Sequence, residues 1–198
     1  MNRRTFLHRA ALLAAGSALV GGCSRSQSEP TAQRAASDST RYVSPVALAE
    51  LDVAHTLDAE VASIDTPSSV WKERLSSERF YILFEEGTER AGTSPLLKET
   101  RRGTFICAAC HLPLFPSSTK YKSGTGWPSF WAPIPGRVGT KRDTKLGYAR
   151  TEYHCRRCGG HQGHIFGDGP DPTGLRYCNN GLALHFIPES DTLPELRT

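Results

Sequence analysis

The sequence predicts a mainly β domain with antiparallel strands, short helices on its N-terminal side and a zinc site that staples it. A chain of 198 residues has room for one ordinary domain plus appendages. After Pro95, short apolar or alternating runs are separated by Gly and Pro, which is typical of antiparallel strands and not of a parallel α/β sheet. Before Pro95 apolar residues recur at helical spacing, and further along four cysteines form two Cys-x-x-Cys pairs.

The first 22 residues resemble an export signal. Residues 3–7 (RRTFL) resemble a twin-arginine signal, and the apolar run that follows, residues 10–20, is too short to span a bilayer. Residues 20–23 (VGGC) resemble the lipobox at which bacterial lipoproteins are cleaved and acylated on Cys23. We therefore expect an exported lipoprotein, anchored to a membrane on the periplasmic side of the cell envelope. The alternative is a basic, apolar N-terminus that arose by chance.

The net charge gives no support to nucleic-acid binding. The chain holds 24 Lys and Arg against 20 Asp and Glu, but removal of residues 1–22 leaves 21 against 20. A nearly neutral mature protein lacks the basic surface that attracts nucleic acid, so we expect no such partner.

Residues 23–69 predict a flexible tether between the lipid and a domain at residues 70–190. The tether is rich in Ser, Ala and Thr, and such a stretch buries too little apolar surface to offset its ordering entropy. Residues 46–61 hold enough Leu, Ala and Val for a weak helix. Within the domain, Trp71 to Phe84 predicts one or two short helices, with Gly87 placed to end them. Six later runs predict strands, at residues 103–107, 114–115, 146–155, 164–166, 176–178 and 182–187.

The six cysteines divide by position. Cys23 lies at the lipobox, Cys178 stands alone, and 44 residues separate the two pairs, which are Cys107-Ala108-Ala109-Cys110 and Cys155-Arg156-Arg157-Cys158. Four thiolates at this spacing suit one closed, tetrahedral, structural Zn²⁺ site. Two disulfides are the alternative for an exported protein, and a thioredoxin-like redox pair is a third interpretation that needs a βαβ context this region lacks.

Three segments carry candidate chemistry around the lone cysteine. Arg176, Cys178 and Asn180 alternate along a strand and can share one face, where a cation favours the nucleophilic thiolate. His161 and His164 lie in a Gly-flanked segment and can supply protons near neutral pH. Residues 123–130 (SGTGWPSF) form a Gly-rich loop that holds Trp127. The plain alternatives are a small buried thiol, two further metal ligands and a structural loop.

Together these segments resemble the methionine sulfoxide reductase B family over roughly residues 70–188. The motifs that carry the resemblance are both cysteine pairs and residues 87–90 (GTER), 123–130, 161–166 (HQGHIF), 168–170 (DGP) and 174–180 (GLRYCNN). The resemblance implies two antiparallel sheets with short helices, and a metal site away from the active site. It also implies reduction of peptide-bound methionine (R)-S-oxide, and hence repair of oxidised proteins.

The resemblance implies a role for each site residue. Cys178 matches the nucleophile that becomes a sulfenic acid, and His164 or His161 matches the acid that protonates the sulfoxide oxygen. Trp127 matches the residue that packs on the substrate methyl group, with Phe166 as a second substrate contact. The polar residues that orient the histidines, water and sulfoxide are Asn180, Asp168 and Arg176.

One position departs from a common version of the family. Members with a second catalytic cysteine often carry it where this chain has Thr125. With Cys23 acylated and four cysteines on zinc, we expect an external reductant, a thioredoxin-like protein or a small thiol. Two competing functions are a zinc-ribbon-like binding module without chemistry, and a disulfide oxidoreductase that uses one Cys-x-x-Cys.

Overall fold

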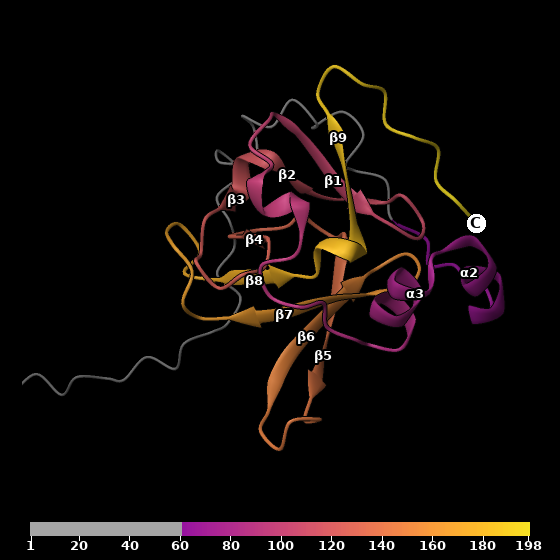
Figure 1. The fold of residues 1–198 in the computed structure, drawn as a ribbon, viewed down its shortest axis with the longest axis horizontal. Coiled ribbons are helices and arrows are strands. Elements are labelled where there is room, and N and C mark those ends of the chain that lie inside the picture. Colours follow the sequence, from indigo (N-terminus) through magenta and orange to yellow (C-terminus); the bar gives the residue numbers. More distant parts are fainter. Residues whose placement is uncertain (1–60) are drawn as a thin grey trace, which may run out of the picture. The chain divides into compact units, whose positions relative to one another are not determined.

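The computed structural model describes residues 61–198 (Figure 1). Two short helices come first, α2 (Ser68–Arg74) and α3 (Ser77–Phe84), and are followed by the 3-10 turn η2 (Pro95–Lys98). The strands of the described chain are β1 (Gly103–Cys107), β2 (Pro113–Pro116), β3 (Lys120–Tyr121), β4 (Ser129–Phe130), β5 (Val138–Asp143), β6 (Arg150–Cys155), β7 (His161–Phe166), β8 (Arg176–Asn179) and β9 (Leu184–Pro188). Two further 3-10 turns are η3 (Ser117–Thr119) and η4 (Gly181–Ala183).

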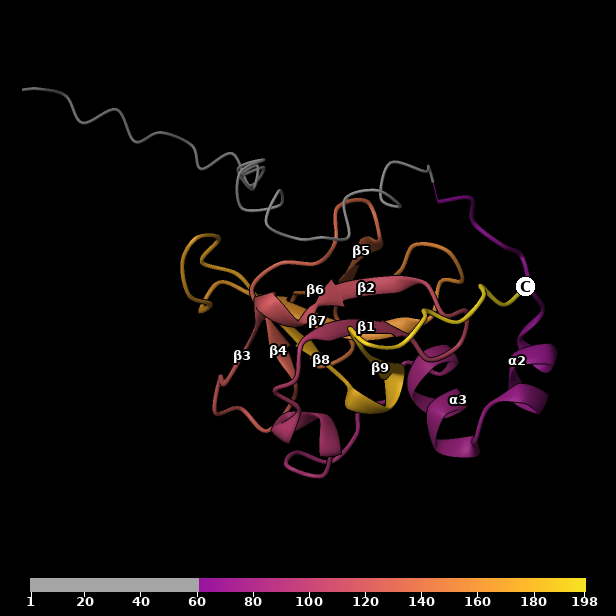
Figure 2. The ribbon, with the colours of Figure 1, turned by 90° about the horizontal axis from the view of Figure 1, so that it is seen from above.

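The strands form two antiparallel sheets, which confirms the predicted mainly β fold. The smaller sheet has the order β2-β1-β9 and the larger one the order β3-β4-β8-β7-β6-β5. In Figure 2 the smaller sheet lies over the strands of the larger one, and helix α3 contacts both β7 and η4 at one end. The larger sheet therefore has an inner face toward its partner sheet and an outer face.

An aromatic cluster fills the space between the two sheets. Phe115 of the smaller sheet stacks on Phe130 of the larger one, with ring centroids 4.2 Å apart, and Phe105 meets the same ring edge-on at 4.9 Å. Tyr153 and Tyr177 continue the cluster along the larger sheet, 5.3 Å apart. Because side chains alternate between the faces of a strand, these inward rings leave the neighbouring residues of β6 and β8 to face outward.

The helices close one end of this core. Ser76 caps α3 by accepting a hydrogen bond from the Arg79 amide at 3.3 Å, and Trp71 of α2 stacks on Phe84 at 5.7 Å. Helix α3 ends where the sequence predicts, and the Gly87 amide donates to the Tyr81 carbonyl at 3.0 Å. The residue with left-handed backbone is Glu86, at φ 55°, and not a glycine.

Several strand bounds differ from the sequence prediction. The predicted strand 146–155 begins only at Arg150, because residues 146–149 form the exposed tip of the β5–β6 hairpin, where Leu146 is 61% exposed. Strand β7 begins at His161 instead of residue 164. Strands β3, β4 and β5 were not predicted, since the first two have two residues each and the last mixes Gly with exposed charged residues.

Packing against the domain extends beyond the predicted limits of 70–190. Val61 and Ile64 contact the core, and the Ile64 amide donates to the Arg157 carbonyl at 2.8 Å, so the end of the predicted tether is held by the domain. Near the other terminus the Arg197 amide donates to the Cys110 carbonyl at 3.0 Å. The export signal, Cys23, the weak helix proposed for residues 46–61 and most of the tether lie outside the described residues. Within residues 61–198, no helix has the length and apolar character that crossing a bilayer requires.

Gly163 provides a test of the β7–β8 pairing. A Cβ atom at Gly163 would lie 1.9 Å from the Cys178 carbonyl oxygen, so Gly163→Ala must push the two strands apart. We expect a loss of about 1–3 kcal/mol in the free energy of unfolding, as for other overpacked sites, measured by denaturant titration. Gly167→Ala is the matched control, because a Cβ there meets nothing within 4 Å. Equal stability of the two variants would contradict this description of the pairing.

Candidate active site

The pairing of β7 with β8 sets the centre of the site. His164 and Cys178 are direct cross-strand partners, and His164 also lies opposite Glu152 of β6. Directly opposed residues project to the same face of an antiparallel sheet, so these three side chains form one row on the outer face. Lys141 of β5 and Ser129 of β4 continue the row at either end.

A bulge in β7 brings the second histidine to the same face. The register shifts between two pairs, Tyr153 with Gly163 and His154 with His161, so Gln162 is the additional residue. Simple alternation would place His161 and His164 on opposite faces, whereas a bulge re-aims the side chains beyond it. The two imidazole rings lie 5.5 Å apart.

A pocket opens on this face above the cysteine. Five of the residues singled out from the sequence line it, together with others that were not. The lining residues are Thr88, Trp127, Arg150, Gly163, His164, Phe166, Cys178, Asn179 and Asn180. Of the remaining predicted site residues, His161 is buried beside His164, while Arg176 and Asp168 lie next to Phe166. The structure therefore brings the predicted residues together around one thiol.

Glu89 holds two walls of the pocket. Its carbonyl accepts a hydrogen bond from the Trp127 indole at 3.1 Å, and its amide donates to the Asn180 side chain at 3.0 Å. Its buried carboxylate accepts from the amides of Gly181 and Leu182 at the start of η4. Burial raises the pKa of Glu89, while these amides oppose the rise. Glu89 lies in the GTER segment of residues 87–90, but no functional role for it was predicted from the sequence.

The electrostatic surroundings of Cys178 differ from the sequence expectation. Burial raises the pKa of the Cys178 thiol, and Arg176 together with a hydrogen bond from Thr125 opposes the rise without cancelling it. The net direction is therefore toward the neutral thiol, whereas the Arg176 charge alone favours thiolate. The Arg176 guanidinium pairs with both Asp168 oxygens, at 2.8 and 2.9 Å, and lies 4.3 Å from the centroid of the Phe166 ring.

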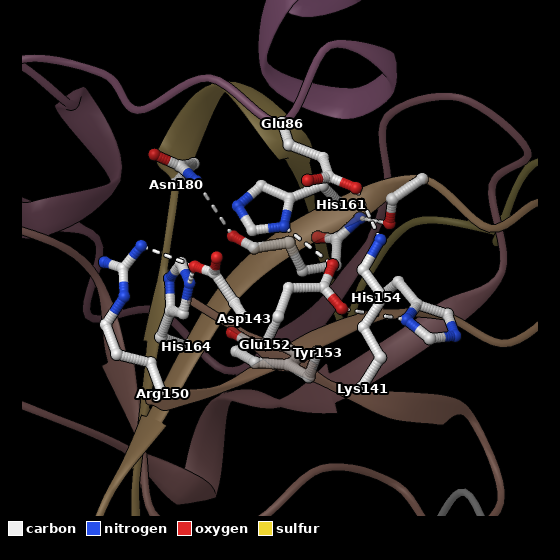
Figure 3. Close-up of polar contacts among 12 residues, drawn as sticks. Glu86, Lys141, Asp143, Arg150, Glu152, Tyr153, His154, His161, His164 and Asn180 are labelled. Carbon is white, nitrogen blue, oxygen red and sulfur yellow. Dashed lines mark hydrogen bonds and ion pairs between the residues drawn. The ribbon is translucent and has the colours of Figure 1, made fainter. Parts of the chain in front are cut away.

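Each histidine is tied to a carboxylate through one ring nitrogen (Figure 3). His164 Nε2 lies 2.7 Å from an Asp143 oxygen that also accepts from Arg150 at 2.5 Å. Burial lowers the pKa of His164, while the hydrogen bond to Asp143 acts in the opposite direction. His161 Nδ1 lies 2.7 Å from Glu152 Oε1, and both side chains are almost fully buried.

The carboxylates and Arg150 were not recognised in the sequence. Arg150, Glu152 and His154 alternate with apolar or small residues in β6, and this polar alternation was the signal that could have identified an outward face. Asp143 lies in β5, for which no strand was predicted. Its pairing with Arg150 depends on the register of the β5–β6 hairpin.

The four paired cysteines form a second, separate cluster. All four sulfur atoms lie within 4.8 Å of one another, and Cys178 is not among them. The pairs Cys107–Cys158 and Cys110–Cys155 have Sγ–Sγ distances of 3.7 and 3.5 Å, too long for disulfides, which require about 2.05 Å. In each of these two pairs, one cysteine comes from the β1–β2 segment of the smaller sheet and the other from the β6–β7 segment of the larger sheet. The cluster could hold a metal ion and would link the two sheets.

A single thiol in a pocket, apart from a four-cysteine cluster that can bind metal, places this domain among the thiol-dependent redox proteins. Comparison with known proteins is more specific, because the SelR domain matches residues 75–188. The peptide methionine sulfoxide reductase MsrB of Agrobacterium fabrum is 48% identical over 132 residues, which are 66% of this chain and 98% of that protein. The peptide methionine sulfoxide reductase MsrB of Leptospira interrogans is 52% identical over 120 residues, which are 60% of this chain and 92% of that protein. The chain belongs to the SelR, or methionine sulfoxide reductase B, family.

Proposed function

We propose that this protein reduces the (R)-S-oxide of methionine in peptides through Cys178. Membership of the family supports methionine sulfoxide reduction and the repair of oxidised proteins. The observation that carries the proposal for this chain is the placement of Cys178 opposite His164 in a pocket walled by Trp127. This arrangement offers a nucleophile, a proton-exchanging group and an apolar surface to one side chain of limited size.

In the first step the Cys178 sulfur bonds to the sulfoxide sulfur. The sulfoxide oxygen takes one proton from the thiol and one from His161 or His164, and leaves as water. Water then cleaves the new S–S bond, which releases methionine, leaves a sulfenic acid on Cys178 and returns one proton to the histidine. The thiol sulfur is oxidised by two electrons and the methionine sulfur is reduced by two.

Selection of one sulfoxide epimer follows from the unlike walls of the pocket. The sulfoxide sulfur carries an oxygen, a methyl group and the rest of the methionine side chain. Trp127 and Phe166 offer apolar faces to the methyl group, while His164 and Asn180 offer polar groups to the oxygen. Exchanging oxygen and methyl would place the oxygen against the indole without a hydrogen bond, which disfavours the S epimer.

Regeneration of Cys178 requires an external dithiol or two small thiols. The other cysteines of the described chain, residues 107, 110, 155 and 158, all belong to the separate cluster. Position 125, which carries a cysteine in some relatives, is a threonine whose hydrogen bonding acts to lower the pKa of Cys178. Two thiols therefore reduce the sulfenic acid, forming a disulfide and water. A thioredoxin-like protein suits this chemistry.

We further propose that the cluster binds one structural Zn²⁺. Four zinc–sulfur bonds of about 2.3 Å in a tetrahedron place the sulfurs about 3.8 Å apart, close to the distances found here. The ligands would be Cys107, Cys110, Cys155 and Cys158, three of them buried, with no open position for substrate. The ion would supply stability to the junction of the two sheets.

The proposed location is the bacterial cell envelope, with the chain anchored through a lipid on Cys23. Support comes from the twin-arginine-like and lipobox-like segments of residues 1–23. Export of folded protein by the twin-arginine route would allow zinc to bind beforehand.

An assay with separate R and S sulfoxide peptides and dithiothreitol tests the proposed activity. We expect turnover of the R epimer alone. Cys178→Ser should reduce it by about 1000-fold or more, because the nucleophile is lost, with zinc content and unfolding free energy retained. Equal activity of the variant, or equal use of both epimers, would contradict the proposal.

Metal analysis tests the proposed zinc site. The purified protein should hold one zinc ion per chain, and its removal by a strong chelator should lower Tm by about 10 °C or more, equivalent to about 3 kcal/mol. Cys178→Ser should bind the same amount of zinc and serves as the control. A metal-free protein with two disulfides among the four cysteines would contradict the assignment.

A further inference from the structure

Glu152 and His161 form a buried pair on the outer face of the larger sheet. Their side chains are 2% and 3% exposed, and His161 Nδ1 lies 2.7 Å from Glu152 Oε1. The other carboxylate oxygen lies 3.1 Å from His154 Nδ1 (Figure 3). Burial acts to raise the pKa of Glu152, but the hydrogen bonds from His154 and His161 lower it to about 2. An ionised carboxylate only accepts hydrogen bonds, so His161 must carry a hydrogen on Nδ1.

The second nitrogen of His161 has no partner. Among the described residues His161 Nε2 is buried and makes no hydrogen bond. In Figure 3 this nitrogen lies on the side of the ring opposite Glu152, toward Asn180 and His164. Asn180 and His164 both line the pocket. A buried nitrogen without a partner costs about 1–3 kcal/mol. A water that donates to Nε2 would complete its hydrogen bonding, and a protonated Nε2 could donate to a sulfoxide oxygen in the pocket.

The neighbouring histidine has a different electrostatic partner. The Asp143 oxygen that meets His164 also accepts from Arg150, so a permanent cation already balances that carboxylate. For Glu152 the hydrogen-bonding partners are the two histidines, while Lys141 acts on it through charge alone and is itself paired with Glu86. Within the described chain the side-chain hydrogen bonds of Glu152 therefore go to imidazoles alone, one of them that of His161.

We infer that Glu152 is a positioning residue for sulfoxide reduction, because it fixes the tautomer and orientation of His161 so that Nε2 exchanges protons with the pocket. This inference rests on the proposed function. Neither fixing the tautomer of His161 nor orienting its ring requires contact between Glu152 and the substrate. Loss of the Glu152 charge should therefore slow the chemical step and leave substrate binding nearly unchanged.

The test compares Glu152→Gln with the unaltered full chain in single turnovers without reductant, so that recycling of the enzyme does not limit the rate. A glutamine keeps the shape of the side chain but can also donate to Nδ1, which permits the other tautomer. We expect the rate constant for methionine formation to fall about 10- to 100-fold at saturating sulfoxide, part of the usual contribution of acid–base catalysis. The sulfoxide concentration for half-maximal rate should change less than about threefold.

Nitrogen NMR of the histidine rings supplies a readout that a purely structural role would not move. His161 in the unaltered chain should be protonated on Nδ1, and Glu152→Gln should reduce that preference. Glu86→Gln is the matched control, because Glu86 forms its ion pairs with Lys141 and Lys145 and with no histidine of the described chain. Glu152→Asp retains the charge and should recover part of the rate. If the glutamine variant fails to fold, the tautomer of His161 in the unaltered chain still tests the inference.

Two results would overturn the inference. One is a Glu152→Gln variant with the normal single-turnover rate and tautomer, even at reduced stability, because Glu152 would then only tie β6 to β7. The other is an unaltered chain whose His161 carries its hydrogen on Nε2 alone. If the unaltered chain reduced no sulfoxide, the proposed function itself would be wrong. The inferred role of Glu152 would then be wrong for that separate reason.

Discussion

The hydrogen-bonded pairing of β7 with β8 places His164 opposite Cys178 and leaves no room for a side chain at Gly163. The position of Cys178 beside His164 depends on that register. A shift by one residue would turn Cys178 toward the aromatic core, because strand side chains alternate between faces. The bulge at Gln162 adds the second imidazole without disturbing this pairing.

The four-cysteine cluster divides the sulfur chemistry of the domain into two parts. Cys107 ends β1 of the smaller sheet and Cys110 lies in the turn that follows, while Cys155 ends β6 of the larger sheet and Cys158 lies in the turn after it. The cluster thus joins the sheets at one place, while Cys178 lies in the pocket at another. Gln162 is a structural link between them, since its side chain lies 3.7 Å from the Cys107 sulfur and its carbonyl accepts from Asn180.

Much of this arrangement could be predicted from the sequence, because glycine, cysteine and histidine spacing carries local information. The helices, the two cysteine pairs and the lone Cys178 required only short segments. Asp143 and Glu152 could not be assigned in this way, since their importance comes from strands that meet them across the sheet. The direction of the Cys178 pKa was also missed, because burial outweighs the effect of Arg176 and depends on the whole pocket.

The central claim is that Cys178 alone takes the sulfoxide oxygen and keeps it until an external reductant arrives. The most direct test supplies one equivalent of (R)-sulfoxide peptide without thiol, traps sulfenic acid with dimedone and locates the adduct by peptide mass mapping. We expect one adduct, on Cys178, and four unmodified cluster cysteines. A disulfide between Cys178 and any cluster cysteine, or adducts on the cluster with Cys178 unmodified, would contradict it.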